Sequence, residues 1–138
     1  MKIDNAFMKG LEIREEELIY FPNGIIGFEN LKKFLLVSND SFQPFNFLVS
    51  SEQKEIAIPV INPFLLIKEY HKNLPGEFTR ELGDLKNGFE VFCVVNPKNT
   101  EGSPTLNLKG PILIDYLKKH GKQIILTADI LTVTYPLS

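Results

Sequence analysis

Three side chains have types that commonly take part in catalysis or metal binding, namely Cys93, His71 and His120. A thiol or an imidazole does such chemistry when a second group at a suitable spacing activates it or shares the metal. Neither histidine has a second His or Cys at ligand spacing, and Cys93 stands in the apolar run VFCVV. No serine lies in a G-x-S-x-G motif, and no calcium-loop pattern is present. The sequence therefore predicts no enzyme, no metal and no cofactor, with Cys93 as a small buried hydrophobic residue.

The segment FPNGIIGFE, residues 21–29, contains two glycines and raises the question of a phosphate-binding loop. Such a loop needs G-x-x-x-x-G-K-[ST], in which the lysine and the hydroxyl contact phosphate and magnesium. Here an aromatic residue and a glutamate follow the second glycine, and no long helix follows that would suit a dinucleotide. We expect instead a tight turn in which Asn23 or Gly24 has a positive φ, while Gly27 lets Phe28 fold back into the core.

The charge balance argues against a nucleic-acid partner. Fifteen Lys and Arg oppose seventeen Asp and Glu, for a net charge of −2, whereas nucleic-acid binders usually carry a basic surplus or stripe. The eleven Phe and four Tyr stand mostly beside aliphatic residues, which favours core packing over base stacking. The acidic run REEEL, residues 14–18, is either a solvated turn or an acidic contact patch.

The elements that must position these residues are mainly strands. The apolar residues come in short β-branched or aromatic runs, separated by turn residues such as NG, ND, NP, EGSP, KG and HG. This pattern is typical of an all-β sandwich or barrel. We expect strands from residue 11 and over 18–21, 34–38, 45–50, 55–61, 64–67, 89–96, 105–108, 111–114, 122–126 and 131–135.

Two of these strands have distinctive sequences. The run at 89–96, FEVFCVVN, is apolar almost throughout, so we expect a central strand covered on both faces. Pro59 and Pro63 cannot donate to a strand ladder, and they indicate an edge position, a bulge or a chain bend around IPVINPF.

Helix is expected in one place only. Residues 75–82 place two apolar side chains four positions apart and are followed by a glycine stop. Shorter helical turns are compatible with 29–34 and with 115–121, the second having Asp115 as N-cap and Gly121 as terminal glycine.

The chain shows no internal repeat, linker or composition break, so residues 1–138 are predicted to form a single domain. The start has no apolar signal region, and no stretch approaches the roughly 20 apolar residues of a membrane span. One cysteine fits a reducing compartment, so we expect a cytoplasmic protein.

Several motifs follow one another in a characteristic order: FPNGIIGFENLKKFLLV, IAIPVINPFLLIKEY, TLNLKGPILID, GKQIIL and a closing YPL. In this order they resemble the FliW family of bacterial flagellar assembly factors. That family opens with F-P-x-G-(I/L)-x-G-F-E, has P-V-I-x-P-F in the middle, and ends with N-L-x-x-P-I-x-(I/V) and G-x-Q-V-I-L. The resemblance covers nearly the whole chain. Asp115 stands where the family often has asparagine, and the segment YLKKH diverges.

The resemblance implies a non-enzymatic regulator with a small, mainly antiparallel β-barrel-like domain. Family members bind the translational repressor CsrA, oppose its repression of flagellin mRNA, and also bind flagellin. The chain would then couple the flagellin level to flagellin synthesis by partner exchange in the bacterial cytoplasm. It would be monomeric when free and would contact neither nucleic acid nor membrane directly.

We predict partner contacts at Asn62, Pro63, Phe64, Tyr70 and Asn107. The proline and phenylalanine of NPF either expose a strand edge and an aromatic anchor, or form a bulge packed on the core. Asn107 lies between two leucines, so strand alternation points it away from their face. There it is either a polar contact or a buried, hydrogen-bonding asparagine. The alternative to this function is a small OB-like β-barrel that binds nucleic acid, for which salt-sensitive oligonucleotide binding is expected.

Overall fold

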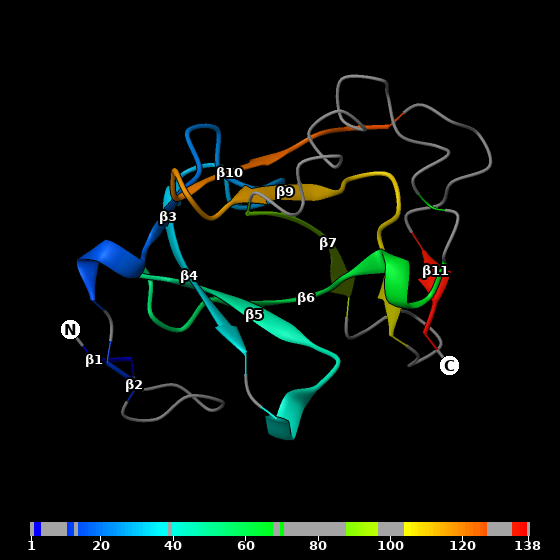
Figure 1. Cartoon of the computed structure of the whole chain (residues 1–138), viewed down its shortest axis with the longest axis horizontal. Helices are drawn as coiled ribbons and strands as arrows, with labels where there is room; N and C mark the ends of the chain where they lie inside the picture. The colour runs from blue at the N-terminus through cyan, green and yellow to red at the C-terminus, as the bar shows by residue number, and fades with distance from the viewer. Residues whose placement is uncertain are drawn as a thin grey trace.

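The computed structural model describes residues 2–3, 11–12, 14–38, 40–67, 70, 88–96, 104–126 and 134–137 (Figure 1). In these ranges the regular structure consists of strands and three short 3₁₀ turns, η1 to η3. The elements, in chain order, are β1 (Lys2–Ile3), β2 (Leu11–Glu12), η1 (Glu15–Glu17), β3 (Ile19–Tyr20), β4 (Lys33–Ser38), η2 (Asp40–Phe42), β5 (Asn46–Ser50), β6 (Ala57–Ile61), η3 (Pro63–Leu65), β7 (Phe89–Asn96), β8 (Thr105–Leu106), β9 (Ile112–Asp115), β10 (His120–Gln123) and β11 (Tyr135–Pro136).

The main sheet closes on itself as a seven-stranded barrel. Strands β3 to β7 pair antiparallel in chain order, and β7 then pairs with β9. The β9–β10 hairpin completes the circle, because β10 lies parallel to β3 with His120 opposite Tyr20. Beyond the barrel, β8 pairs with the end of β7 and with β11, while β1 and β2 pair with each other. The predicted all-β, mainly antiparallel barrel is confirmed.

The barrel interior is filled by alternate residues of its strands. Phe34 of β4, Leu48 of β5, Ile58 of β6, Phe92 of β7 and Ile112 of β9 belong to one buried cluster. Because these strands lie around the whole barrel, a cluster that joins them occupies its centre. We call it the interior cluster; its other buried members are Ile19, Phe21, Ile25, Leu31, Val60 and Ile114.

The intervening residues pack on the outside. Val91, Cys93 and Val95 of β7 share a second cluster with Leu113 of β9, and the whole outer cluster is Ile61, Tyr70, Val91, Cys93, Val95, Leu106, Leu108, Leu113 and Leu126. Strand β7 is therefore buried on both faces, as its apolar sequence predicts. The buried position predicted for Cys93 is also confirmed, since its side chain is 0% exposed.

The structure differs from the sequence expectations in the segment that follows β6. Residues 64–67 were expected to form a strand, but the chain turns in η3, where Asn62 caps the turn and Pro63 takes its first position. The bend predicted from the prolines is confirmed at Pro63. Pro59 lies inside β6, which pairs with both β5 and β7, and the pairing with β7 starts only at Val60.

The expected helices have different outcomes. The helix at 75–82 lies outside the described residues. Residues 29–34 do not form a helical turn, because Lys33 already pairs with Tyr20 at the start of β4. The strand predictions otherwise hold within the described ranges, with boundaries shifted by one to three residues where the ladders end.

Candidate partner-binding site

The bend after β6 carries three of the predicted contact residues. The side-chain oxygen of Asn62 accepts a hydrogen bond from the backbone N–H of Phe64 at 2.9 Å, which holds the first turn of η3. Pro63 is buried, and Phe64 is half-buried against the outer cluster. The turn therefore presents the two following residues to solvent, Leu65 at 65% and Leu66 at 43% exposure. These two leucines were not singled out in the sequence, because 64–67 reads as a strand.

Tyr70 packs under this bend, on the side that faces the protein interior. Its side chain is fully buried, and its hydroxyl donates to the carbonyl oxygen of Leu108 at 2.5 Å. The rings of Tyr70 and Phe64 meet edge to face, with centroids 5.8 Å apart. Burial and the neighbouring Cys93 thiol raise the pKa of Tyr70 far above its usual value, so the hydroxyl stays protonated as a donor. In this structure Tyr70 supports the surface of the bend and is not part of it.

Asn107 is half-buried and stabilises the turn that follows it. It directly precedes Leu108, whose carbonyl oxygen accepts the hydrogen bond from Tyr70. Its side-chain oxygen accepts from the backbone N–H groups of Lys109 (3.0 Å) and Gly110 (3.1 Å). A side chain at Gly110 would clash with the amide nitrogen of Gln123, 2.8 Å from the ideal Cβ position. Asn107 therefore meets both expectations in part: its side chain hydrogen-bonds within its own turn, but the residue is half-buried and not fully buried. Thus the rings of Phe64 and Tyr70 touch, while Asn107 is the sequence neighbour of Leu108, whose carbonyl oxygen accepts from Tyr70.

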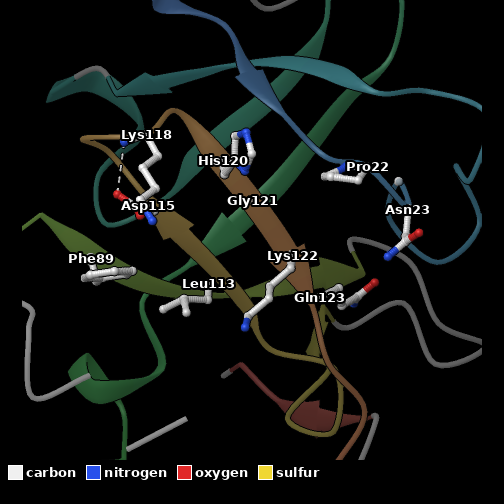
Figure 2. Close-up of a pocket in the computed structure, with 11 residues that line it drawn as sticks. Pro22, Asn23, Phe89, Leu113, Asp115, Lys118, His120, Gly121, Lys122 and Gln123 are labelled. Atoms are coloured by element: carbon white, nitrogen blue, oxygen red, sulfur yellow. Dashed lines mark hydrogen bonds between the residues drawn. The ribbon is translucent and has the colours of Figure 1, made fainter. Parts of the chain in front are cut away.

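A second feature of the surface is a pocket of about 400 Å³, at the outer side of the β9–β10 hairpin (Figure 2). One wall is the turn after β3, and the other is the hairpin with the start of β7. Its lining residues are Pro22, Asn23, Gly24, Phe89, Leu113, Asp115, Lys118, His120, Gly121, Lys122 and Gln123. None of them was among the predicted contact residues.

The turn wall is the segment that resembled a phosphate loop. Gly24 has φ +66°, and a Cβ there would lie 2.7 Å from the backbone of Glu29, so only glycine suits this position. Phe28 returns to pack against the interior cluster, as predicted. The Phe21 ring lies against Gly121 of β10, whose ideal Cβ would be 2.3 Å from the ring. The segment is thus a structural turn, and it also forms one wall of the pocket.

The hairpin wall is organised by Asp115. One of its carboxylate oxygens accepts from the backbone N–H groups of Leu117 (3.0 Å) and Lys118 (3.1 Å), so the predicted capping hydrogen bonds are present. The helical turn expected over 115–121 is wrong, because Asp115 ends β9 and the segment is the hairpin turn to β10. The terminal glycine was placed wrongly: Lys119 takes the left-handed conformation (φ 56°), while Gly121 belongs to β10. The reason is the Phe21 ring, which occupies the space a side chain would need at 121.

Strand register places the pocket residues in two rows. In one row Asp115 of β9 lies between Phe89 of β7 and His120 of β10, and in the next row Leu113 faces Lys122 (Figure 2). Gln123 links the two walls, because its side-chain oxygen accepts from the N–H of Ile26 at 2.8 Å. No sequence motif brings these residues together, since the rows depend on strand pairing over long separations.

The arrangement does not resemble a catalytic centre. Burial raises the pKa of the Cys93 thiol to about 12, so it is not a thiolate nucleophile at neutral pH. Among the described residues, no three His, Cys, Asp or Glu side chains gather as a metal site. The described part of the chain also contains no helix with the length and apolar character needed to cross a membrane.

The surface does not resemble a base-stacking surface either. Phe21, Phe34 and Phe92 are buried in the interior cluster, and Tyr20 is the one large aromatic side chain among the described residues that is classed as exposed. The acidic residues of η1 are exposed, and their recorded ion pairs are Arg14–Glu17 at 4.0 Å and Lys33–Glu15 at 3.3 Å. Solvated pairs of this kind add little stability. The acidic turn is thus available to a partner, and the OB-like nucleic-acid alternative is not favoured.

Comparison with known proteins identifies relatives of the whole chain. The family model described as "FliW protein" matches residues 2–137. The "Flagellar assembly factor FliW" of Caldicellulosiruptor saccharolyticus is 39% identical over 128 residues, which are 92% of this chain and 81% of the relative. The protein of the same name from Clostridium acetobutylicum is 36% identical over 138 residues, covering 99% and 98%. A "Crystal structure of the flagellar assembly factor FliW" superposes with a TM-score of 0.80 at 27% identity, covering 100% of this chain and 97% of that one.

Proposed function

This chain belongs to the FliW family of flagellar assembly factors, and from this premise we propose that it acts by binding two proteins in exchange. One partner is the translational regulator CsrA, whose repression of flagellin mRNA is relieved when it is bound. The other is flagellin, which competes for the same pool of factor. The factor is non-enzymatic and works in the bacterial cytoplasm. Free flagellin then lowers the amount of factor available to CsrA, and flagellin synthesis falls.

The observation that supports a binding function most directly is the bend at η3. Two leucines are exposed side by side in the sequence, on a turn that Asn62 caps and that Phe64 and Tyr70 anchor. A preorganised apolar surface loses little conformational entropy on association, which favours affinity. Because much of their surface is exposed in the isolated barrel, these leucines can still bury apolar area against a partner and form the centre of an interface.

The predicted contact residues enter this proposal with different roles. Phe64 and the two leucines after it form the contact surface, while Asn62 and Pro63 set the geometry of the turn. Tyr70 and Asn107 act by position, because their polar atoms are engaged inside the protein. A substitution at Tyr70 should therefore weaken binding through the shape of the bend.

Charge supports CsrA as one of the partners. The chain has a net charge of −2, and η1 exposes three consecutive glutamates, residues 15–17. An acidic factor is electrostatically suited to a basic RNA-binding protein, and it repels RNA from the complex. Both effects decrease as salt screens the charges, over a Debye length of about 8 Å at physiological ionic strength.

The experiment is calorimetric titration of the protein with CsrA from the same genome, with and without saturating flagellin. We expect binding to CsrA that flagellin abolishes or strongly weakens. Leu65→Asp should weaken binding of at least one partner by about tenfold or more, equivalent to about 1.4 kcal/mol. Ile26→Asp is the matched control, since Ile26 is similarly exposed (56%) in a different segment. Absence of heat and of co-elution with both partners at micromolar concentration would refute the proposal.

A further inference from the structure

We propose that the pocket at the β9–β10 hairpin binds an acidic segment of a partner protein, with an apolar side chain of that segment in the pocket. The inference rests on the proposed function, because it assigns a second contact surface to a factor that binds proteins. The pocket and η3 use different residues, although both adjoin the outer cluster: Leu113 belongs to it, and Phe89 and Phe64 pack against it. The β9–β10 hairpin lies beside β3, whereas η3 follows β6 (Figure 1).

The pocket lies on a face of the barrel that the interior does not use. Leu113 belongs to the outer cluster and Ile112 and Ile114 to the interior cluster, so Leu113 points outward. Lys122 is directly opposite Leu113 in the β9–β10 ladder and shares its face. Figure 2 shows the Lys122 side chain beside Leu113 on this outer side. The register therefore combines a cation with an apolar floor.

The floor and the rim have the composition of a peptide-binding surface. Phe89 and Leu113 line the pocket, and Phe89 is only half-buried. At the hairpin tip Leu117 is 77% exposed, and on the neighbouring strand Tyr20 is 43% exposed with its ring edge-on to His120 at 5.9 Å. A volume of about 400 Å³ is within the range of about 300–1,000 Å³ of ligand pockets and suits a few side chains.

The charges select an acidic occupant. Lys118 and Lys122 line the pocket and are exposed, and His120 lies between them in the sequence. The one carboxylate among the described residues that line the pocket, Asp115, already accepts hydrogen bonds from two backbone N–H groups of its own turn. In a chain whose net charge is −2, this hairpin is a local concentration of cations. A carboxylate within a Debye length of both lysines is attracted, whereas a basic segment is repelled.

A protein segment fits better than a nucleic acid. A polynucleotide that tracks across the hairpin would approach β3, and η1 with its exposed glutamates directly precedes that strand. Single-strand binding also relies on several exposed aromatic rings, and Tyr20 is the exposed large aromatic of the described surface. A short acidic peptide instead needs two cations and an apolar floor, which the pocket provides.

The test uses fluorescein-labelled 15-residue peptides that tile the flagellin and CsrA sequences of the same genome, measured by anisotropy. We expect an acidic peptide to bind the wild-type protein, and both Lys118→Glu and Lys122→Glu to weaken it by about tenfold or more. Lys54→Glu is the matched control with the same charge change, on the turn between β5 and β6, and should bind like wild type. Circular dichroism melts of each variant verify that the fold is unchanged.

A charge-swapped peptide makes the result specific. When the glutamates and aspartates of the binding peptide are replaced by lysine, binding to the double variant K118E/K122E should recover while binding to wild type is lost. The pocket inference is overturned if no acidic peptide binds, or if Lys118→Glu and Lys122→Glu bind the peptide as wild type does. It is also overturned if an RNA oligonucleotide binds at the pocket in place of the peptide. Titrations with intact CsrA and intact flagellin report separately on the proposed function. If the intact proteins bind but no acidic peptide does, the pocket inference is rejected and the proposed function stands.

Discussion

Replacement of Gly121 by alanine should destabilise the barrel strongly, because the Phe21 ring occupies the space of the added methyl group. An ideal Cβ at Gly121 lies 2.3, 2.5 and 2.7 Å from three atoms of that ring. Carbon atoms in contact are normally about 3.5–4.0 Å apart, so the ring or strand β10 must move by more than about 1 Å. Phe21 is 0% exposed and packs edge to face on Phe34 at 5.4 Å, which leaves little room.

The magnitude follows from this overlap. Overpacking a core costs about 1–3 kcal/mol, and a clash with a rigid ring should be at the upper end, about 3 kcal/mol. For an m-value of about 2 kcal/mol per M urea, the midpoint of unfolding should fall by about 1.5 M. Far-UV circular dichroism during urea titration measures it. A marginally stable domain would lose a large part of its about 5–15 kcal/mol.

Two further variants separate the clash from other effects. Gly27→Ala introduces the same methyl group where nothing lies within 4 Å, although φ is +90°, so it reports backbone strain without overlap. Phe21→Leu removes part of the ring, and the double variant Phe21→Leu/Gly121→Ala should be more stable than the sum of the single effects predicts. If Gly121→Ala changes stability by less than about 0.5 kcal/mol, or if the double variant is additive, the reasoning is refuted.

Three other predictions follow from the hydrogen bonds and pKa values. Tyr70→Phe removes the hydroxyl that donates to Leu108 and should cost about 1–3 kcal/mol in urea unfolding; an unchanged midpoint would show that the bond contributes nothing. Cys93, with its pKa raised to about 12 by burial, should resist a thiol reagent at pH 8 until the protein is unfolded in urea; rapid labelling of native protein would contradict this. The N–H of Gly27 donates to Glu29 and lowers the pKa of that carboxyl, so its stabilisation is present above the unfolded value of 4.5 and is lost as the pH falls through the lower folded value. Glu29→Gln should accordingly be less stable than wild type at pH 7 and equal to it in acid, and a gap that persists unchanged at low pH would disprove the assignment.

Local patterns in the sequence were sufficient to predict an all-β fold, either a sandwich or a barrel, and the family resemblance favoured the barrel. The alternating and continuous apolar runs predicted the strands, because side chains in a strand point to opposite faces whatever the partner strand is. The all-apolar sequence around Cys93 likewise predicted a strand covered on both sides. The capping role of Asp115 and the turn at Gly24 also followed from local chemistry, since a side-chain oxygen or a missing Cβ acts within a few residues.

The sites depended on contacts between distant parts of the chain. Residues 64–67 read as a strand by composition, yet Asn62 and Pro63 turn the chain there, and Tyr70 with Leu108 holds the bend. As a result the exposed leucines of η3 were not predicted. Gly121 read as a helix stop, whereas the Phe21 ring, one hundred positions away in the sequence (121 − 21), makes it a strand residue.

The pocket shows the same division most clearly. Lys122 and Leu113 become neighbours only through the β9–β10 register, and Asn23 reaches them only because β10 pairs with β3 and closes the barrel. The sequence by itself determined the strands, the turns and the family. The tertiary structure decided which side chains share a surface, because hydrophobic periodicity specifies the face of each strand but not the strand that will lie beside it.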